Sequence, residues 1–162
     1  MAGTDRFIEI VIVGRNVSAV AKLLTEEAPR TCAAVWDELP ITGDAYHAKW
    51  AGKELYTLVP PLKTDPGKEN ATITPIPGDV LYIPVPATSI DLPVELRRQS
   101  PGGWADLAVF YGRNSLLLGP DGFMPGNLFA TIVDNLEEFA EACAWLFRHG
   151  TAGERLEFRR VE

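Results

Sequence analysis

The stretch from Asp106 to Val133 restricts the choice of fold more than any other part of the chain. Two apolar runs typical of β-strands flank a loop rich in glycine and proline. Such turns connect short strands, and small β-proteins place binding residues where the turns meet strand ends. Polar side chains stand at these junctions: Arg113, Asn114, Asp121 and Asn127. The stretch therefore predicts a β-rich protein with a site near these turns.

The composition of the whole chain agrees with this prediction. Its 162 residues include 14 glycines and 13 prolines, which favour short strands and many turns over a helix bundle. The length predicts one domain, residues 1–162, with a hydrophobic core of its own. The net charge of -7 argues against a nucleic-acid partner, which needs a basic face, and against an anionic membrane surface.

Short β-prone runs recur along the chain. Phe7–Val13 is almost wholly apolar, which predicts a strand buried on both faces or nearly so. Val17–Leu24 fits a strand or a helix, and the turn-like residues before it favour a strand paired with the first. The remaining expected strands are Ile41–Trp50 and Glu54–Val59 around a turn at Gly52, Ala71–Thr74, Asp79–Pro84, Ala105–Tyr111, Leu128–Val133 and a last one near Leu156–Val161.

Two segments between these runs lack periodicity. Residues 60–70 are polar and contain three prolines, which predicts a mobile, exposed loop that forms a rim or a lid. Residues 85–103 have turn signals at both ends. We expect a long connection there, with at most a short strand.

The first of two helical patterns covers Ala28–Leu39. Pro29 suits the first helical position, where its missing N–H costs nothing, and Pro40 ends the helix. Glu26 and Glu27 lie where the helix dipole favours negative charge. A single apolar stripe, with i, i+3, i+4 and i+7 spacing, consists of Cys32, Val35, Trp36 and Leu39.

The second helical pattern covers residues 135–149. Asp134 is the expected N-cap, with Glu137 completing a capping box, and Gly150 is the expected stop. The predicted buried stripe consists of Leu136, Phe139, Ala140, Cys143, Leu146 and Phe147.

The two cysteines, Cys32 and Cys143, both fall on these stripes. Buried, unpaired thiols are typical of a reduced compartment. The first residues show no signal-peptide pattern, and no apolar run is long enough to span a bilayer. The sequence thus predicts a cytoplasmic protein.

The order of these elements predicts the architecture. The strands do not alternate with helices in a βαβ rhythm. A closed antiparallel barrel satisfies the strand edges, and helices over its open ends bury both apolar stripes. We therefore expect a mainly β (α+β) fold with about eight strands, capped by helices at about 28–39 and 135–149.

Several blocks of the sequence resemble one family. These blocks are A-P-R-T-C-A-A-V-W-D-E-L-P, H-A-K-W-A-G-K-E-L-Y, P-G-D-V-L-Y-I-P, F-Y-G-R-N-S and G-P-D-G-F-M-P-G-N-L-F-A. In their order and spacing they resemble the cyclophilin-like proteins of unknown function from bacterial and archaeal genomes, and they extend from Ala28 to Val133. The resemblance implies a closed, eight-stranded cyclophilin-type barrel with two capping helices.

The same resemblance bears on activity. Peptidyl-prolyl isomerases of this fold carry an F-H-R-I-I-P-G-F-M-x-Q-G-G-D block with a catalytic arginine, whereas the comparable stretch here is Y-H-A-K-W-A-G-K-E-L-Y. The resemblance therefore does not imply prolyl isomerase activity. Cyclophilin-like domains also occur in allophanate-hydrolase and oxoprolinase-type proteins, so small amide or lactam chemistry is an analogy of fold alone.

Three ionisable residues are the candidate catalytic groups: His47, Glu54 and Arg113. A histidine in a strand is a candidate acid or base, or simply a half-exposed strand residue. Glu54 is a candidate base or ligand anchor, and its alternative is a solvated strand face. Arg113 with the adjacent Asn114 suits a carboxylate or carbonyl, and its alternative is to brace the loop.

The candidate ligand-binding residues surround these groups: Trp50, Tyr56, Tyr111, Asn114, Phe123 and Asn127. Phe123 is a candidate pocket wall, and Asn127 either binds ligand or caps its own turn. Because side chains alternate along a strand, Trp50 and His47 share a pocket only if the strand bulges or turns between them.

Other common sites lack their signatures. The two histidines are far apart and no cysteine cluster occurs, which argues against a metal site. Neither of the glycine-rich phosphate-binding motifs nor G-x-S-x-G is present, so no cofactor is expected.

The function expected from these residues is binding or transformation of a small polar, carboxylate- or amide-bearing metabolite in a cleft at the barrel mouth. One alternative is a peptide-binding module or a weak prolyl isomerase. Another is a non-catalytic oligomeric accessory subunit. The expected partners are a small molecule and a second copy in a homodimer.

Overall fold

The computed structural model describes residues 3–90 and 92–162, which contain eleven strands and three helices. The strands are β1 (Phe7–Ile12), β2 (Val17–Leu23), β3 (Ile41–His47), β4 (Glu54–Val59), β5 (Ala71–Thr72), β6 (Asp79–Val85), β7 (Trp104–Phe110), β8 (Leu118–Gly119), β9 (Gly122–Phe123), β10 (Gly126–Asp134) and β11 (Arg155–Arg160). The helices are α1 (Pro29–Glu38), α2 (Val94–Gln99) and α3 (Leu136–His149). No helix among the described residues is long and apolar enough to cross a membrane.

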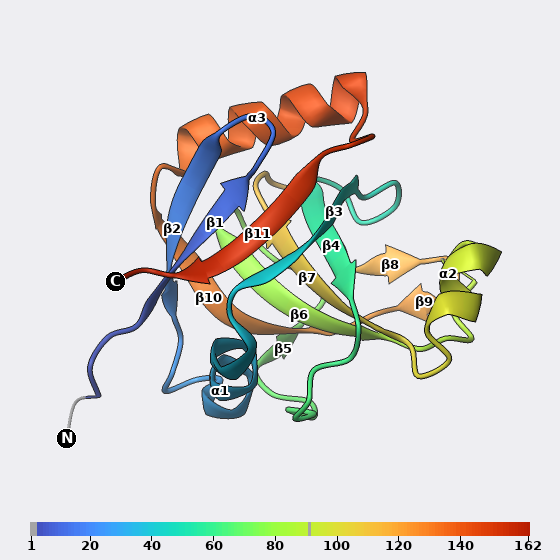
Figure 1. The fold of residues 1–162 in the computed structure, drawn as a ribbon, viewed down its shortest axis with the longest axis horizontal. Helices are drawn as coiled ribbons and strands as arrows, with labels where there is room; N and C mark the ends of the chain where they lie inside the picture. The colour runs from blue at the N-terminus through green and yellow to red at the C-terminus, as the bar shows by residue number, and fades with distance from the viewer. Residues whose placement is uncertain (1–2, 91) are drawn as a thin grey trace.

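Eight strands form a closed antiparallel barrel, as predicted. Their order is β2-β1-β11-β3-β4-β7-β6-β10, and pairing of β2 with β10 closes the ring (Figure 1). β5 extends β10 at one end, while β8 and β9 form a separate two-stranded hairpin. Closure leaves the eight long strands without a free edge, which protects them from pairing with other chains.

The barrel interior holds the main hydrophobic core. In β1 the alternate residues Ile8, Ile10 and Ile12 are fully buried there, while Phe7, Glu9 and Val11 are only partly buried. The predicted burial on both faces, or nearly so, is therefore complete on the inner face and only partial on the outer one. In a closed barrel one face of each strand points outward, and on β1 that face carries Glu9, which forms an ion pair with Arg159.

Helices α1 and α3 lie over opposite ends of the barrel (Figure 1), as the two apolar stripes predicted. On α1 the predicted stripe is buried or partly buried, and Cys32 donates to the carbonyl of Phe129 at 3.3 Å. Glu26 and Glu27 precede α1, and its first turn contains no acidic residue. The two carboxylates thus stand just before the N-terminus of α1, where they were predicted.

The start and the stripe of α3 differ in detail from the prediction. The N-cap is Asn135 rather than Asp134, and its amide contacts the carboxylate of Glu138 at 3.0 Å. Asn135 adopts a left-handed conformation, with φ of 64°, which asparagine tolerates better than most residues. The expected capping box of Asp134 and Glu137 was therefore wrong, and no side-chain hydrogen bond caps the helix at Asn135.

Phe147 was also predicted to be buried, but it is 65% exposed. The stripe at Phe139, Cys143 and Leu146 is buried as expected, and Ala142 joins it. The buried face of α3 is therefore centred closer to Ala142, and further from Phe147, than predicted.

The segment from residue 85 to 103 was predicted as a connection with at most a short strand. Instead it contains the six-residue helix α2. Helices this short have no room for a repeated apolar stripe, so periodicity could not reveal it. The segment is tied to the β8–β9 turn, because Ser89 donates to the carboxylate of Asp121 at 2.6 Å.

A second, smaller hydrophobic cluster lies on the outer face of the barrel. Alternate residues of β6 divide between the two cores: Val80 and Tyr82 belong to the interior, Leu81 and Ile83 to the outer cluster. The outer cluster consists of Leu81, Ile83, Ala108, Phe110 and Leu117, with Ala51, Tyr56, Ile73, Met124 and Leu128 packed against it. The loops that follow β3 and β7 thus have an apolar surface to pack on.

Candidate functional site

Two segments that contain predicted site residues, the β3–β4 turn and the residues after β7, lie side by side. The turn between β3 and β4 is joined to the residues after β7 by two backbone hydrogen bonds, from Tyr111 N to Lys53 O at 3.0 Å and from Leu116 N to Ala51 O at 3.0 Å. Gly112 also packs directly against the Lys53 side chain. We call the region formed by residues 47–56 and 110–116 the rim. Seven of the nine predicted site residues lie in the rim: His47, Trp50, Glu54, Tyr56, Tyr111, Arg113 and Asn114.

Strand alternation divides the rim residues between two faces of the sheet. His47 is paired with Leu55, which is fully buried in the interior, so His47 points inward. Tyr46 is paired with Tyr56, which packs on the outer cluster, so the Tyr46, Tyr56 and Glu54 side chains point outward. The structure therefore does not place His47 and Glu54 on one face.

The inward group is a polar contact at the α3 end of the barrel. His47 Nε2 lies 2.6 Å from the hydroxyl of Tyr111, and His47 Nδ1 lies 2.8 Å from the carbonyl of Ala48. A carbonyl only accepts, so Nδ1 carries the proton and Nε2 accepts from the Tyr111 hydroxyl. The ring of Phe147 covers His47 with a centroid separation of 4.7 Å.

Burial controls the charge state of this pair. It lowers the pKa of His47 below its ordinary value, against the opposing effect of the bond to Ala48. Burial also raises the pKa of Tyr111 to about 12. Both groups are therefore neutral at neutral pH, and the proton of the shared hydrogen bond stays on the tyrosine.

Acid should destabilise the protein through His47. Because its pKa is lower in the folded state than the unfolded value of about 6.5, the stability that neutral His47 contributes is present above that pH and is lost as the pH falls through the folded pKa. We expect the free energy of unfolding in urea to drop from about pH 7.5 to about pH 5.5, and to drop less in His47→Gln. Equal losses in the two proteins would contradict this assignment.

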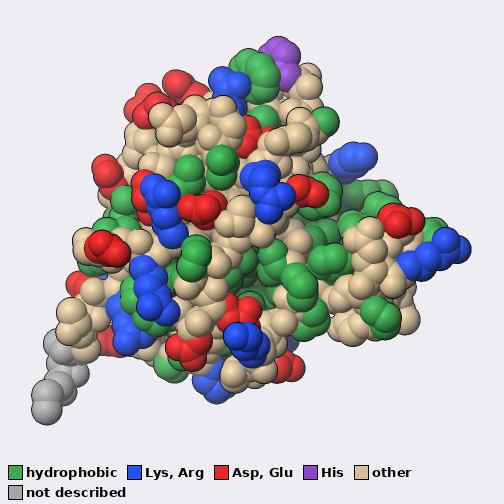
Figure 2. Space-filling model, in the orientation of Figure 1, with side chains coloured by type: hydrophobic (Ala, Val, Ile, Leu, Met, Phe, Trp, Pro, Cys, Tyr) green, Lys and Arg blue, Asp and Glu red, His purple; other side chains and the backbone are tan. Residues whose placement is uncertain are grey.

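The outward group combines a carboxylate with aromatic rings. Glu54 is only 4% exposed although it is ionisable. Tyr56 follows two residues later on the same face and stacks on Tyr46, with ring centroids 5.5 Å apart, while Phe110 is the cross-strand partner of Glu54. In Figure 2, hydrophobic side chains gather in the area between the barrel and the part that carries α2, at the right. A carboxylate beside aromatic surface suits a ligand with N–H donors.

The remaining rim residues are exposed. Trp50 is 64% exposed, Arg113 and Asn114 are both exposed, and Asn114 has a left-handed φ of 63°. Arg113 takes part in none of the ion pairs recorded among residues 3–90 and 92–162. Its guanidinium is thus available to an anionic group at the rim. Phe123, on β9, is 60% exposed.

Asn127 lies apart from the rim, next to α1. It accepts from the Glu69 amide at 3.1 Å, and its own amide donates to the carbonyl of Gly67 at 2.8 Å and to the hydroxyl of Thr31 at 3.1 Å. These bonds hold residues 60–70 in place. Most of residues 60–70 are exposed, as predicted, and the hydrogen bonds of the Asn127 side chain go to Thr31, Gly67 and Glu69 instead of to its own turn.

Glu69 was not among the predicted site residues, yet it satisfies the first turn of α1. Its carboxylate accepts from the amides of Arg30 and Thr31 and from the Thr31 hydroxyl, at 2.8–3.2 Å. Burial raises the pKa of Glu69, but the hydrogen bonds of Thr31 and Arg30 outweigh it and keep the pKa below its ordinary value. The signal in the sequence was the lack of a capping side chain at Ala28.

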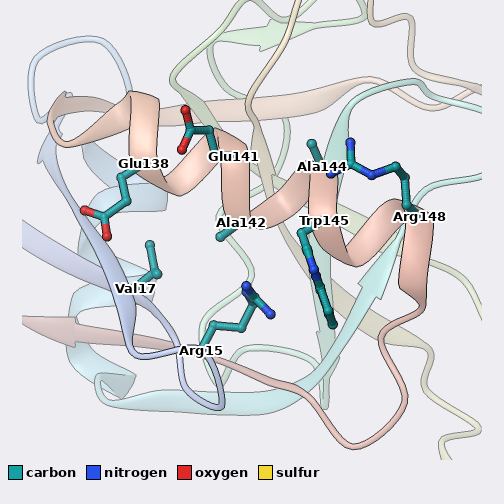
Figure 3. A pocket seen from close by; sticks show the side chains of 8 residues that line it. All are labelled: Arg15, Val17, Glu138, Glu141, Ala142, Ala144, Trp145 and Arg148. Atoms are coloured by element: carbon teal, nitrogen blue, oxygen red, sulfur yellow. The ribbon is translucent and has the colours of Figure 1, made fainter.

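A groove of about 490 Å³, which no sequence pattern predicted, lies between α3 and the β1–β2 turn. Figure 3 shows Arg15 reaching from the turn toward the helix, beside Trp145. The guanidinium of Arg15 lies 3.9 Å from the centre of the Trp145 ring. In the part of the chain that the structure describes, no three His, Cys, Asp or Glu side chains are grouped to hold a metal ion.

A family model for proteins of unknown function, DUF3830, matches residues 10–158. The chain belongs to the DUF3830 family. Among curated proteins, no sequence matches it significantly. None of the comparisons names a cyclophilin-like family, so that resemblance stays a prediction.

The solved structures that resemble this DUF3830 protein include two that differ in length. The structure of McbB in complex with tryptophan has a TM-score of 0.65 and 21% identity, and the similarity covers 94% of this chain but 44% of McbB. This chain thus spans less than half the length of McbB. The solution structure of the hypothetical protein AF2241 from Archaeoglobus fulgidus has a TM-score of 0.54 and 20% identity, covering 99% of this chain and 100% of AF2241. At these identities the likeness concerns the fold alone.

Proposed function

We propose that this DUF3830 protein binds a small polar metabolite, bearing a carboxylate or an amide, on the outer side of the rim. The observation that carries the proposal is the pair of backbone hydrogen bonds that joins the β3–β4 turn to the residues after β7. This adjacency places the buried carboxylate of Glu54 and the exposed guanidinium of Arg113 on neighbouring segments. Groups of opposite charge beside aromatic surface fix the orientation of a small ligand.

The individual residues have separate roles in this proposal. Glu54 accepts from an N–H of the ligand, and Arg113 with Asn114 binds its carboxylate or carbonyl oxygen. Tyr56 and Trp50 supply flat surface for the remainder of the molecule. His47 and Tyr111 are positioning residues, because their bond braces the two segments from inside the barrel.

Two similarities are consistent with this proposal. McbB is shown with tryptophan, a small molecule that carries an amine and a carboxylate. The predicted resemblance to cyclophilin-like domains of amide- and lactam-handling proteins points to the same class of ligand, by analogy of fold.

A thermal-shift screen of amino acids, small carboxylates, amides and lactams tests the proposal, followed by calorimetry on the ligands found. We expect Glu54→Gln and Arg113→Gln each to weaken binding at least about tenfold, which corresponds to about 1.4 kcal/mol. Matched controls are Glu26→Gln and Lys68→Gln, which make the same charge changes at exposed positions outside the rim and should leave the dissociation constant unchanged. Binding that survives both rim replacements would contradict the proposal.

A further inference from the structure

The outward face of α3 carries charges of both signs in a fixed order. Glu137, Glu141, Ala144 and Arg148 follow one another at i, i+4, i+7 and i+11, so they form one stripe along the helix. The three charged members are exposed, and Ala144 is partly buried. The acidic half is N-terminal and the basic half C-terminal, the order that the helix dipole favours.

These charges are not neutralised by neighbours. Glu141 and Arg148 are seven residues apart, which separates them by about 10 Å along the helix axis. Neither residue, nor Arg15 beside them, takes part in the ion pairs recorded among the described residues. The stripe therefore presents separated charges to solvent.

Trp145 forms a fixed ridge next to the stripe. Its ring lies between the guanidinium of Arg15, at 3.9 Å, and the ring of His149, which stacks on it at 4.2 Å. It is still 37% exposed. The adjacent position, Ala144, is small, so a bulky aromatic side chain stands beside a shallow spot on the same helix.

We propose that this face binds a second copy of the chain, with the two α3 helices antiparallel around a twofold axis. An antiparallel copy presents its basic half to the acidic half of the first, so Glu141 of each copy meets Arg148 of the other. The same axis brings the Trp145 side chains of the two copies next to each other along one side of the helix pair, because the axis passes between positions 144 and 145. A twofold interface uses one patch twice, and this patch is complementary to itself in charge.

The order of acidic and basic residues along α3 favours a second copy of the chain over other partners. A purely acidic partner meets like charge at Glu137 and Glu141, and a purely basic one meets like charge at Arg15 and Arg148. The face is limited to one helix and the adjoining β1–β2 turn, which is small against the roughly 800 Å² per partner of a standard interface. Net charge of -7 on each copy also opposes association. The dimer is therefore weak, with a dissociation constant of tens to hundreds of micromolar, on the order of 10⁻⁵ to 10⁻⁴ M.

Sedimentation velocity of the whole protein, from about 5 μM to about 1 mM, measures this equilibrium. We expect the wild type to pass from monomer to dimer over this range. Glu141→Arg and Arg148→Glu should each weaken association at least about tenfold. The double variant Glu141→Arg/Arg148→Glu reverses both members of each pair, so it should regain the association constant of the wild type to within about threefold.

Glu26→Arg is the matched control, since it makes the same charge change as Glu141→Arg at an exposed position before α1. It should associate as the wild type does. Circular dichroism shows whether each variant keeps its fold, and the exposed positions make unfolding unexpected. A wild type that stays monomeric throughout, or a double variant as weak as the single ones, would overturn the proposal.

Discussion

Replacing Phe139 by alanine is expected to lower the free energy of unfolding by about 3–5 kcal/mol. Phe139 is fully buried on the inner face of α3, where it packs into the barrel core with Cys143 and Leu146. Its removal takes apolar surface out of the core and leaves a cavity that the rigid barrel cannot fill by moving inward. Against a typical total of about 5–15 kcal/mol, this loss is a large share of the stability.

Urea denaturation followed by circular dichroism measures the loss by linear extrapolation. Phe123→Ala is the matched control, because it deletes the same side chain at a position that is 60% exposed. We expect that change to stay within about 0.5 kcal/mol of the wild type. If the two alanine variants were equally stable, α3 would not be a plug of the barrel core.

Asn127→Ala is expected to cost about 2–4 kcal/mol, the second largest effect. The side chain is only 3% exposed and links three elements: β10, helix α1 through Thr31, and the 60–70 loop through Gly67 and Glu69. Each bond contributes about 1 kcal/mol, and the buried groups that lose their partner add to the cost. Chemical unfolding measures the total, and hydrogen exchange at the Glu69 amide should accelerate as the loop is released.

A double-mutant cycle with Thr31→Ala separates the hydrogen bond from the loss of packing. The two side chains are in contact, at 3.1 Å, so their effects should fall short of a simple sum by about 0.5–3 kcal/mol. Strict additivity would mean that Asn127 acts through something other than this bond.

Local signals in the sequence were sufficient for the fold. The stripes at Cys32 and Val35 and at Phe139 and Cys143 predicted both capping helices, because a helix needs only residues three and four positions apart to show its buried face. Short β-prone runs without a βαβ rhythm, together with the family resemblance, indicated a closed antiparallel barrel. The six-residue helix α2 was missed because it is shorter than two turns.

The site was predicted only in part, since its geometry depends on strand register. His47 and Glu54 lie on opposite faces because His47 is paired with Leu55, the neighbour of Glu54. The turn of six residues between β3 and β4 does not by itself determine this register, so the sequence could not predict it. The role of Asn127 was beyond prediction for a similar reason. Its partners Thr31, Gly67 and Glu69 lie 58 to 96 residues away, and no local pattern connects such distant groups.

Each end of the barrel is covered by a helix that contains one buried thiol, Cys32 on α1 and Cys143 on α3. Reaction of these thiols can therefore be used to detect local opening of either helix. Burial raises the pKa of Cys32 to about 12 and raises that of Cys143 as well, so almost no reactive thiolate is present while the helices stay docked. Alkylating reagents modify each sulfur only when its helix lifts away from the strands. The relative labelling rates of Cys32 and Cys143 therefore show which of the two helices undergoes local opening more often.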